Sequence, residues 1–192
     1  MRIIAGLFRG RKLVAPEGLA TRPITDRVKQ SLFDILTPLL PDSIVYDCFA
    51  GTGSMGLESL SRGCSSVTFF ESDRSAVSRL RRNISTFSVE HQSRIVSTDL
   101  FRYFSDTRNA AAPDGRATIV FLDPPYRFLT ERPSELLTLS QSLATHHLRP
   151  TGLVVFRHDS ATSLGLPPLI VHDSRRYGSM TLDFLVFPNR VV

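Results

Sequence analysis

From residue 44 onward, short apolar runs alternate with segments that have helical periodicity. The apolar runs, which are typical of buried strands, occupy residues 44–48, 66–71, 94–98, 118–122 and 152–157. Helices are expected between them, and their starts fall near Ser54, Asp73, Leu100 and Pro133. Because strands that alternate with helices assemble into a parallel sheet covered on both faces, the sequence predicts an α/β fold.

The C-terminal segment breaks this alternation. Residues 169–174 and 180–187 are predicted to be two strands joined by a turn at Tyr177-Gly178, with no helix between them. They predict an antiparallel hairpin at the edge of the sheet. A length of 192 residues is typical of one domain, so a single domain over residues 1–192 is expected.

A basic arm, residues 1–20, precedes this core. Within it, residues 1–5 and 12–15 can pair as a hairpin. Residues 25–37 predict a helix that has Thr25 as its N-cap. The apolar face of this helix is expected to consist of Val28, Leu32, Ile35 and Leu36.

The strand over residues 118–122 runs directly into Asp123-Pro124-Pro125-Tyr126. This segment suits chemistry on an amine attached to a flat ring, whose lone pair is delocalised into the ring. The Asp123 carboxylate and the Pro124 carbonyl can accept the two amine hydrogens and so free that lone pair. The two prolines fix φ at consecutive positions, and Tyr126 can stack on the ring. The simpler alternative is a turn that ends the strand, because Asp and Pro are common turn residues.

The first strand leads into a glycine-rich segment, residues 47–56. Gly51 and Gly53 permit a tight turn and a close approach of the backbone to a ligand, and the following helix presents its N-terminal N–H groups there. Glu71, at the end of the second strand, suits the two hydroxyls of a ribose. Asp99, after the third strand, can accept from an adenine amine. The ends of the strands therefore predict an adenosine-containing cofactor.

The glycine segment also fits the dinucleotide pattern G-x-G-x-x-G. Asp47 precedes the glycines, where it would repel a pyrophosphate but suits a cationic ligand. Asp-Pro-Pro-Tyr has no evident task in hydride transfer, and no second, substrate-binding domain follows. These features favour S-adenosylmethionine over a nicotinamide cofactor.

The charge of the chain favours a polyanionic partner. The net charge is +5 and the isoelectric point is about 9.8, which is typical of proteins that bind nucleic acid. Arg9, Arg11 and Lys12 in the arm are expected to contact RNA phosphates.

Other features indicate where the protein works. Cys48, Cys64 and the five histidines show no metal-ligand spacing, so no metal site is expected, and the two cysteines are expected to be buried free thiols. No apolar run has membrane-spanning length, and the N-terminus does not have the pattern of a signal peptide. A cytoplasmic location follows as an expectation.

The chain resembles the bacterial 16S ribosomal RNA guanine-N2 methyltransferases that modify a single guanine. The resemblance is carried by Arg2-Ile3-Ile4-Ala5-Gly6, Arg9-Gly10-Arg11, Arg22-Pro23-Ile24-Thr25-Asp26-Arg27-Val28-Lys29, Ser31-Leu32-Phe33, residues 47–61, Asp123-Pro124-Pro125-Tyr126 and Tyr177-Gly178. It implies a Rossmann-like class I methyltransferase fold, with seven strands that are mostly parallel and a last strand that is antiparallel. It also implies methyl transfer from S-adenosylmethionine to the N2 amine of a guanine in 16S ribosomal RNA, within a partly or fully assembled small subunit. Separately from the resemblance, the protein is expected to be a monomer.

By the same resemblance, Thr25 lies near the methionine end of the cofactor. The middle of the cofactor is lined by Asp47, Ala50, Gly51 and Gly53. Glu71 holds the ribose, and Asp99 and Leu100 flank the adenine. Asp123 and Tyr126 hold the target base.

The chain departs from the family pattern at Ile24, Gln30 and Cys48, and none of these residues belongs to the predicted chemical core. Three other functions stay open. One is a DNA or RNA amino methyltransferase that acts on adenine N6 or cytosine N4, which would share every catalytic residue. The other two are a nicotinamide-dependent oxidoreductase and a non-catalytic RNA-binding subunit.

Overall fold

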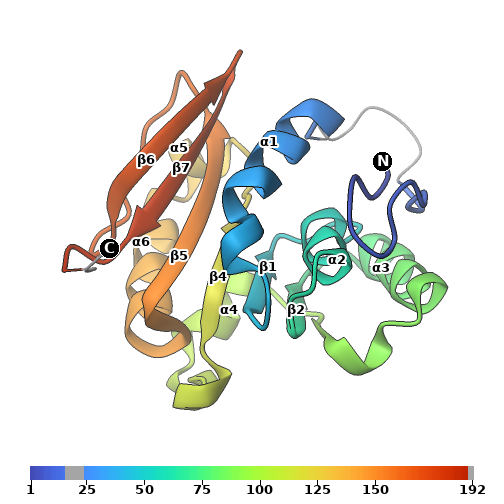
Figure 1. Ribbon diagram of the computed structural model, residues 1–192. Helices are drawn as coiled ribbons and strands as arrows, with labels where there is room; N and C mark the ends of the chain where they lie inside the picture. The colour runs from blue at the N-terminus through green and yellow to red at the C-terminus, as the bar shows by residue number, and fades with distance from the viewer. Residues whose placement is uncertain (16–23, 190–192) are drawn as a thin grey trace. The chain divides into compact units, whose positions relative to one another are not determined.

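The structure is a computed structural model that describes residues 1–15 and 24–189 (Figure 1). Residues 16–20 of the predicted arm and the Arg22-Pro23 part of the family motif lie outside the described residues. The chain folds into two compact units, Met1–Ser97 and Thr98–Val192. A single domain over residues 1–192 stays a prediction.

The first unit contains a parallel three-stranded sheet in the order β3-β2-β1. Its strands are β1 (Ile44–Cys48), β2 (Ser66–Phe70) and β3 (Ser93–Val96), and they are connected through α2 (Ser54–Ser61), α3 (Arg74–Phe87) and η2 (Glu90–Gln92). The predicted strands and helices are therefore confirmed here. Val45, Leu57, Phe69 and Leu80 are fully or almost fully buried and form part of the core.

The ends of the helices in the first unit follow from local chemistry. Asp73 caps α3, since its carboxylate accepts a 2.7 Å hydrogen bond from the Ala76 amide. Gly63 follows the end of α2 with φ of 97°, a conformation that glycine adopts without strain.

The predicted helix at residues 25–37 is observed as α1 (Asp26–Leu36), followed by η1 (Thr37–Leu39). Thr25 is its N-cap, and the Thr25 hydroxyl accepts from the Val28 amide at 3.4 Å. The prediction for its apolar face was wrong at Ile35, which is 37% exposed. The buried stripe instead consists of Val28, Lys29, Leu32, Phe33 and Leu36. Ile35 lies off this stripe, because each residue advances about 100° around a helix.

The predicted N-terminal hairpin is reduced to a single antiparallel bridge between Arg2 and Lys12. The Ile3 amide donates to the Arg11 carbonyl at 3.0 Å, and the Gly10 amide donates to the Ile3 carbonyl at 2.9 Å. The pairing of the two segments is confirmed, but neither segment forms a regular strand.

The second unit contains four strands in the order β4-β5-β7-β6. They are β4 (Ala117–Leu122), β5 (Leu148–Asp159), β6 (Ile170–Tyr177) and β7 (Met180–Val186). β4 and β5 are parallel, whereas β7 is antiparallel to both β5 and β6, with the turn at Tyr177-Gly178. The predicted C-terminal hairpin is confirmed, and the chain has the predicted α/β fold with seven mostly parallel strands and an antiparallel last strand.

The helices of the second unit are α4 (Leu100–Ser105), η3 (Thr107–Asn109), η4 (Pro113–Gly115), α5 (Phe128–Glu131), α6 (Pro133–Ser142) and η5 (Leu143–His147). The short helix α5 begins two residues after Tyr126 and was not predicted. In the described ranges, none of the helices combines the length and the hydropathy needed to cross a bilayer.

Candidate active site

The loop after β1 is shaped by two glycines that do different work. Gly53 has φ of 81°, and a Cβ there would lie 2.4 Å from Leu80 Cδ1, so only glycine fits. Gly51 has φ of 57°, but a Cβ there would meet nothing within 4 Å. The backbone at Gly51 therefore borders open space, where a ligand can approach it. Ala50 ties the loop to the sheet, because its amide donates to the Phe70 carbonyl at 3.0 Å.

Glu71 lies directly after β2 and is hydrogen-bonded to the loop after β1. Its Oε2 accepts from the Gly51 amide at 2.8 Å, and its Oε1 accepts from the Asp73 amide at 2.8 Å. These two bonds fix the orientation of the carboxylate. Each carboxylate oxygen can accept a second hydrogen bond, so the arrangement suits the predicted pair of ribose hydroxyls.

Asp47 is a buried residue of β1. Its Oδ2 accepts from the Gly56 amide at 2.9 Å, which places a negative charge at the N-terminal end of α2. The structure thus gives Asp47 a role in positioning the glycine loop. Its predicted role toward a cofactor stays a prediction.

In the second unit, Asp99 is the N-cap of α4, and its Oδ1 accepts from the Arg102 amide at 3.0 Å. The next residue, Leu100, is buried. Arg132 lies near this cap, with its guanidinium nitrogen Nη1 4.0 Å from Asp99 Oδ2. The same guanidinium lies over the rings of Phe101 and Phe128, at 4.2 Å and 4.9 Å from their centroids. Arg132 was not predicted from the sequence.

Asp123-Pro124-Pro125-Tyr126 forms a turn that opens α5. The Pro125 carbonyl accepts from the Phe128 amide at 2.8 Å, and the Tyr126 carbonyl accepts from the Leu129 amide at 3.2 Å. Pro124 is buried, whereas Tyr126 is half-buried and Pro125 is exposed. The segment is therefore a strand-ending turn, and its Asp and Tyr side chains are partly accessible.

Asp123 has a partner that was not predicted from the sequence. Arg157 Nε lies 2.6 Å from Asp123 Oδ1. Burial raises the pKa of Asp123 above its ordinary value, and the Arg157 charge opposes that rise. A basic residue at the end of the apolar run over residues 152–157 was the available signal, because neighbouring parallel strands bring their ends together.

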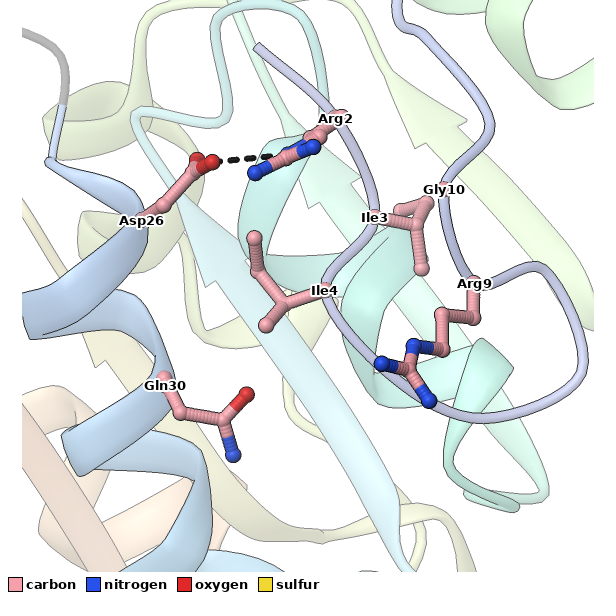
Figure 2. A pocket seen from close by; sticks show the side chains of 7 residues that line it. All are labelled: Arg2, Ile3, Ile4, Arg9, Gly10, Asp26 and Gln30. Atoms are coloured by element: carbon pink, nitrogen blue, oxygen red, sulfur yellow. Dashed lines mark hydrogen bonds and ion pairs between the residues drawn. The ribbon is translucent and has the colours of Figure 1, made fainter.

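The three predicted RNA-binding cations have different surroundings. Arg11 is held within the structure: it donates to the Thr86 carbonyl, and its guanidinium lies 4.6 Å from the centroid of the Phe87 ring. Arg9 and Lys12 are exposed. Arg9 lines a pocket of about 270 Å³ (Figure 2). The other residues that line it are Arg2, Ile3, Ile4, Gly10, Asp26 and Gln30.

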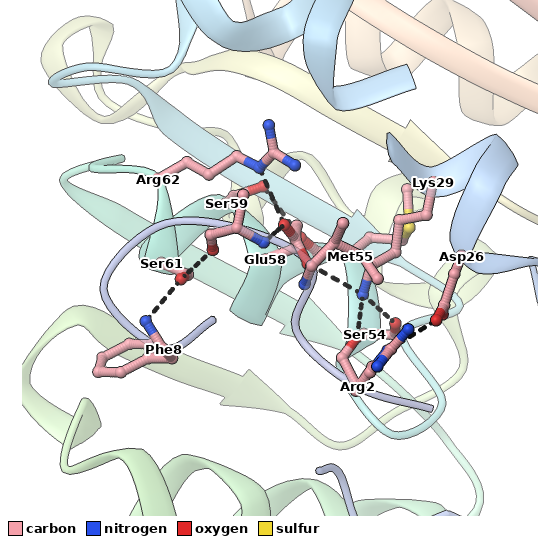
Figure 3. Close-up of polar contacts among 12 residues, drawn as sticks. Arg2, Phe8, Asp26, Lys29, Ser54, Met55, Glu58, Ser59, Ser61 and Arg62 are labelled. Atoms are coloured by element: carbon pink, nitrogen blue, oxygen red, sulfur yellow. Dashed lines mark hydrogen bonds and ion pairs between the residues drawn. The ribbon is translucent and has the colours of Figure 1, made fainter. Parts of the chain in front are cut away.

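A buried charge cluster holds the arm in place, and no pattern in the sequence indicated it (Figure 3). Glu58 on α2 is fully buried and accepts from the amides of Ile4 and Ala5 at 2.8 Å and 3.0 Å. It also pairs with Lys29 at 3.1 Å and with Arg62 at 2.9 Å. Four donors thus surround one carboxylate, which meets the requirement that a buried charge be paired.

Both cysteines and two of the histidines, His147 and His158, are buried. Cys48 and Cys64 are buried free thiols, as predicted, and burial raises the pKa of Cys64 to about 12. His158 contacts Asp183 Oδ2 at 2.9 Å, and His147 is buried beside Phe104. Among the described residues, no three His, Cys, Asp or Glu side chains form a group that could hold a metal ion.

A family model described as Conserved hypothetical protein 95 matches residues 1–186. The Escherichia coli K12 protein named Ribosomal RNA small subunit methyltransferase D is 39% identical over 127 residues, which are 66% of this chain and 61% of that protein. The chain thus spans less than two thirds of that relative. A Haemophilus influenzae protein of the same name is 37% identical over 156 residues, which are 80% of this chain and 76% of that protein.

Solved structures agree in fold. The Escherichia coli protein yhhF, named a candidate methyltransferase, has a TM-score of 0.80 at 31% identity, with 96% of each chain covered. A hypothetical protein from Thermus thermophilus has a TM-score of 0.77 at 30% identity, with 97% of this chain and 99% of that chain covered. The fold is the Rossmann-like fold of class I methyltransferases. Since the family model spans nearly the whole chain, this protein belongs to the family described as Conserved hypothetical protein 95.

Proposed function

We propose that this protein transfers a methyl group from S-adenosylmethionine to the exocyclic N2 amine of one guanine in 16S ribosomal RNA. Its family includes relatives named as ribosomal RNA small subunit methyltransferases. The observation that carries the proposal is Asp123, a partly accessible carboxylate fixed by Arg157 in a turn at the end of β4. Such a group can accept a hydrogen bond from a ring amine and stabilise positive charge on it.

The first unit fits S-adenosylmethionine in two respects. Gly51 offers backbone that borders open space, and Glu71 offers a carboxylate whose orientation is fixed by two amides. When bound, the cofactor supplies a methyl group activated by a sulfonium. The residues that would hold it are Thr25, Asp47, Ala50, Gly51, Gly53, Glu71, Asp99 and Leu100.

The catalytic work of the chain is to orient the amine. Asp123 and the Pro124 carbonyl accept its two hydrogens, which localises the nitrogen lone pair. Asp123 then stabilises the positive charge that develops on that nitrogen. Pro124 and Pro125 restrict the backbone of the turn, and Tyr126 stacks on the base. Most of the rate enhancement would come from holding the reacting atoms in line.

The arm would bind RNA outside the reaction site. Arg9 and Lys12 are exposed and suited to phosphate contacts. Arg11 is engaged with Thr86 and Phe87, so we assign it to fixing the arm before any contact with RNA. The substrate would be a partly or fully assembled small subunit, and the enzyme would act in the cytoplasm as a monomer.

A second candidate is methylation of adenine N6 or cytosine N4, because those amines would use the same Asp-Pro-Pro-Tyr groups. The two candidates are distinguished by incubating the protein with labelled S-adenosylmethionine and small subunits that lack base methylation, and then identifying the modified nucleoside by mass spectrometry. We expect N2-methylguanosine at a single position. N6-methyladenosine or N4-methylcytidine would establish the second candidate in its place.

The same assay tests Asp123. Asp123→Ala is expected to lower kcat by at least about a hundredfold, because removing a preorganised group that stabilises transition-state charge typically has an effect of that size. Asp123→Asn should be less impaired, because its amide oxygen still accepts one hydrogen bond. Cofactor affinity, measured by calorimetry, should stay within about twofold in both variants, since Asp123 is assigned to the base. If Asp123→Ala methylated RNA at the wild-type rate, Asp-Pro-Pro-Tyr would be a strand-ending turn with no catalytic role.

A further inference from the structure

The ion pair between Asp123 and Arg157 follows from the register of the sheet. β4 and β5 are parallel, and Leu122 on β4 is paired with Phe156 on β5. The residues that follow this pair are Asp123, directly after the end of β4, and Arg157, inside β5, so the register brings them side by side. Arg157 Nε lies 2.6 Å from Asp123 Oδ1, and the two side chains are 17% and 26% exposed. A charge-assisted hydrogen bond of this length is among the stronger side-chain contacts.

The contact with Arg157 restricts the orientation of the Asp123 carboxylate. Arg157 binds Asp123 through Oδ1, so a rotation of the carboxylate would break the bond. The second oxygen, Oδ2, is thereby given one direction. The amine nitrogen must change from planar to tetrahedral before it attacks. An acceptor with a fixed direction favours the tetrahedral geometry, whereas a freely rotating carboxylate would hydrogen-bond to the planar amine equally well.

The surroundings of the pair favour a strong electrostatic effect. Burial raises the pKa of Asp123, and Arg157 lowers it through its charge and its hydrogen bond. In the described part of Thr98–Val192, Arg157 is the charged group that acts on Asp123. On β7, Met180 places its uncharged Sδ 3.8 Å from Arg157 Nη1.

We propose that Arg157 is a positioning residue for the methyl transfer: it holds the Asp123 carboxylate ionised and directs Oδ2 toward the substrate amine. The catalytic part of this inference, the effect of Arg157 on methyl transfer, rests on the proposed function. Its electrostatic part concerns this chain alone and can be measured without cofactor or RNA.

The catalytic part is tested with Arg157→Met, which keeps much of the side-chain length, and with Arg157→Lys, which keeps the charge. Arg157→Met should lower kcat at pH 7 by about tenfold or more, with KM for RNA within about twofold, and should move the acid limb of the kcat profile upward by about one pH unit. Arg157→Lys should restore the acid limb and part of kcat. Arg108→Met, which removes the exposed partner of Asp106 in the same unit, is the control and should match the wild type.

The electrostatic part is tested by following the Asp123 carboxyl carbon in a carbon-13 NMR titration of the free protein. The pKa of Asp123 should be about one unit or more higher in Arg157→Met than in the wild type. Equal pKa values, or an unchanged kcat and acid limb in Arg157→Met, would overturn the inference. A raised pKa together with a wild type that methylates no RNA would support the ion pair and overturn the proposed function.

Discussion

At the scale of the residue, the buried charged groups are the ones that most need hydrogen-bond and ion-pair partners. Burial lowers the pKa of Lys29, and the Glu58 carboxylate opposes that change. Lys29 satisfies its donors by pairing with Glu58 and by donating to the Arg2 carbonyl at 2.9 Å and to Ser54 Oγ at 3.2 Å. A buried ion pair adds little net stability against apolar residues of the same shape, but removing one partner leaves an uncompensated charge.

Glu58→Gln should therefore destabilise the protein by about 3–5 kcal/mol, since Lys29 and Arg62 would lose their shared anion. Urea unfolding followed by circular dichroism measures this loss. Glu131→Gln is the matched control, because Glu131 belongs to an exposed ion pair with Arg127 and its loss should change stability by less than about 1 kcal/mol. Equal effects of the two substitutions would contradict the role given to burial.

His147 predicts how stability depends on pH. Burial, followed by the charges of His146 and Arg116, lowers the pKa of His147 from 6.5 to about 4. Because the folded-state pKa lies below the unfolded value, the unfolded chain binds more protons between these values. Stability is then fully present above pH 6.5 and falls by up to about 3 kcal/mol as the pH decreases toward 4.

The measurement is urea unfolding at a series of pH values between about 7 and 4. His147→Phe should flatten the profile across this range, since it removes the titrating group and keeps an aromatic ring beside Phe104. A profile that is as steep in His147→Phe as in the wild type would assign the pH dependence to other groups.

At the scale of the element, the N-terminal arm is built into the first unit. The Leu7 amide donates to the Ser61 carbonyl at 2.8 Å, and the Phe8 amide donates to Ser61 Oγ at 2.9 Å. Val14 and Asn83 exchange two further hydrogen bonds at 2.8 Å and 3.2 Å. Deleting the arm would remove donors from the buried Glu58, so single substitutions are the sounder test of RNA binding.

Substitutions at Gly6 and Gly10 separate the effect of close packing from the effect of backbone strain in this arm. Their φ values are 80° and 82°, but a Cβ on Gly6 would lie 1.8 Å from the Ser61 carbonyl oxygen, whereas a Cβ on Gly10 would meet nothing within 4 Å. Gly10→Ala should destabilise by about 1 kcal/mol through strain, and Gly6→Ala by clearly more because the arm must move. Thermal unfolding compares the two, and equal losses would mean that the close approach at Ser61 does not matter.

At the scale of the whole molecule, the net charge of +5 makes a prediction about RNA affinity. Arg9→Gln and Lys12→Gln should each weaken RNA binding and reduce the slope of log affinity against log salt by about one, if each contacts a phosphate. Cofactor affinity should be unchanged. Arg74→Gln, on an exposed position of α3 outside the arm, is the control for a general effect of charge. If both variants had the wild-type slope of log affinity against log salt, the arm would not be part of the RNA interface.

The residue pattern alone predicted the succession of strands and helices, the N-cap at Thr25 and the groups at the ends of the strands. These features depend on residues close together in the chain, whose periodicity and capping chemistry act locally. Tertiary packing was needed to place Ile35 off the buried face of α1, to bring Glu58 together with Lys29 and the arm, and to pair Arg157 with Asp123. Those contacts join residues that are distant in sequence. They depend on strand register and helix packing, which arise only when the elements assemble.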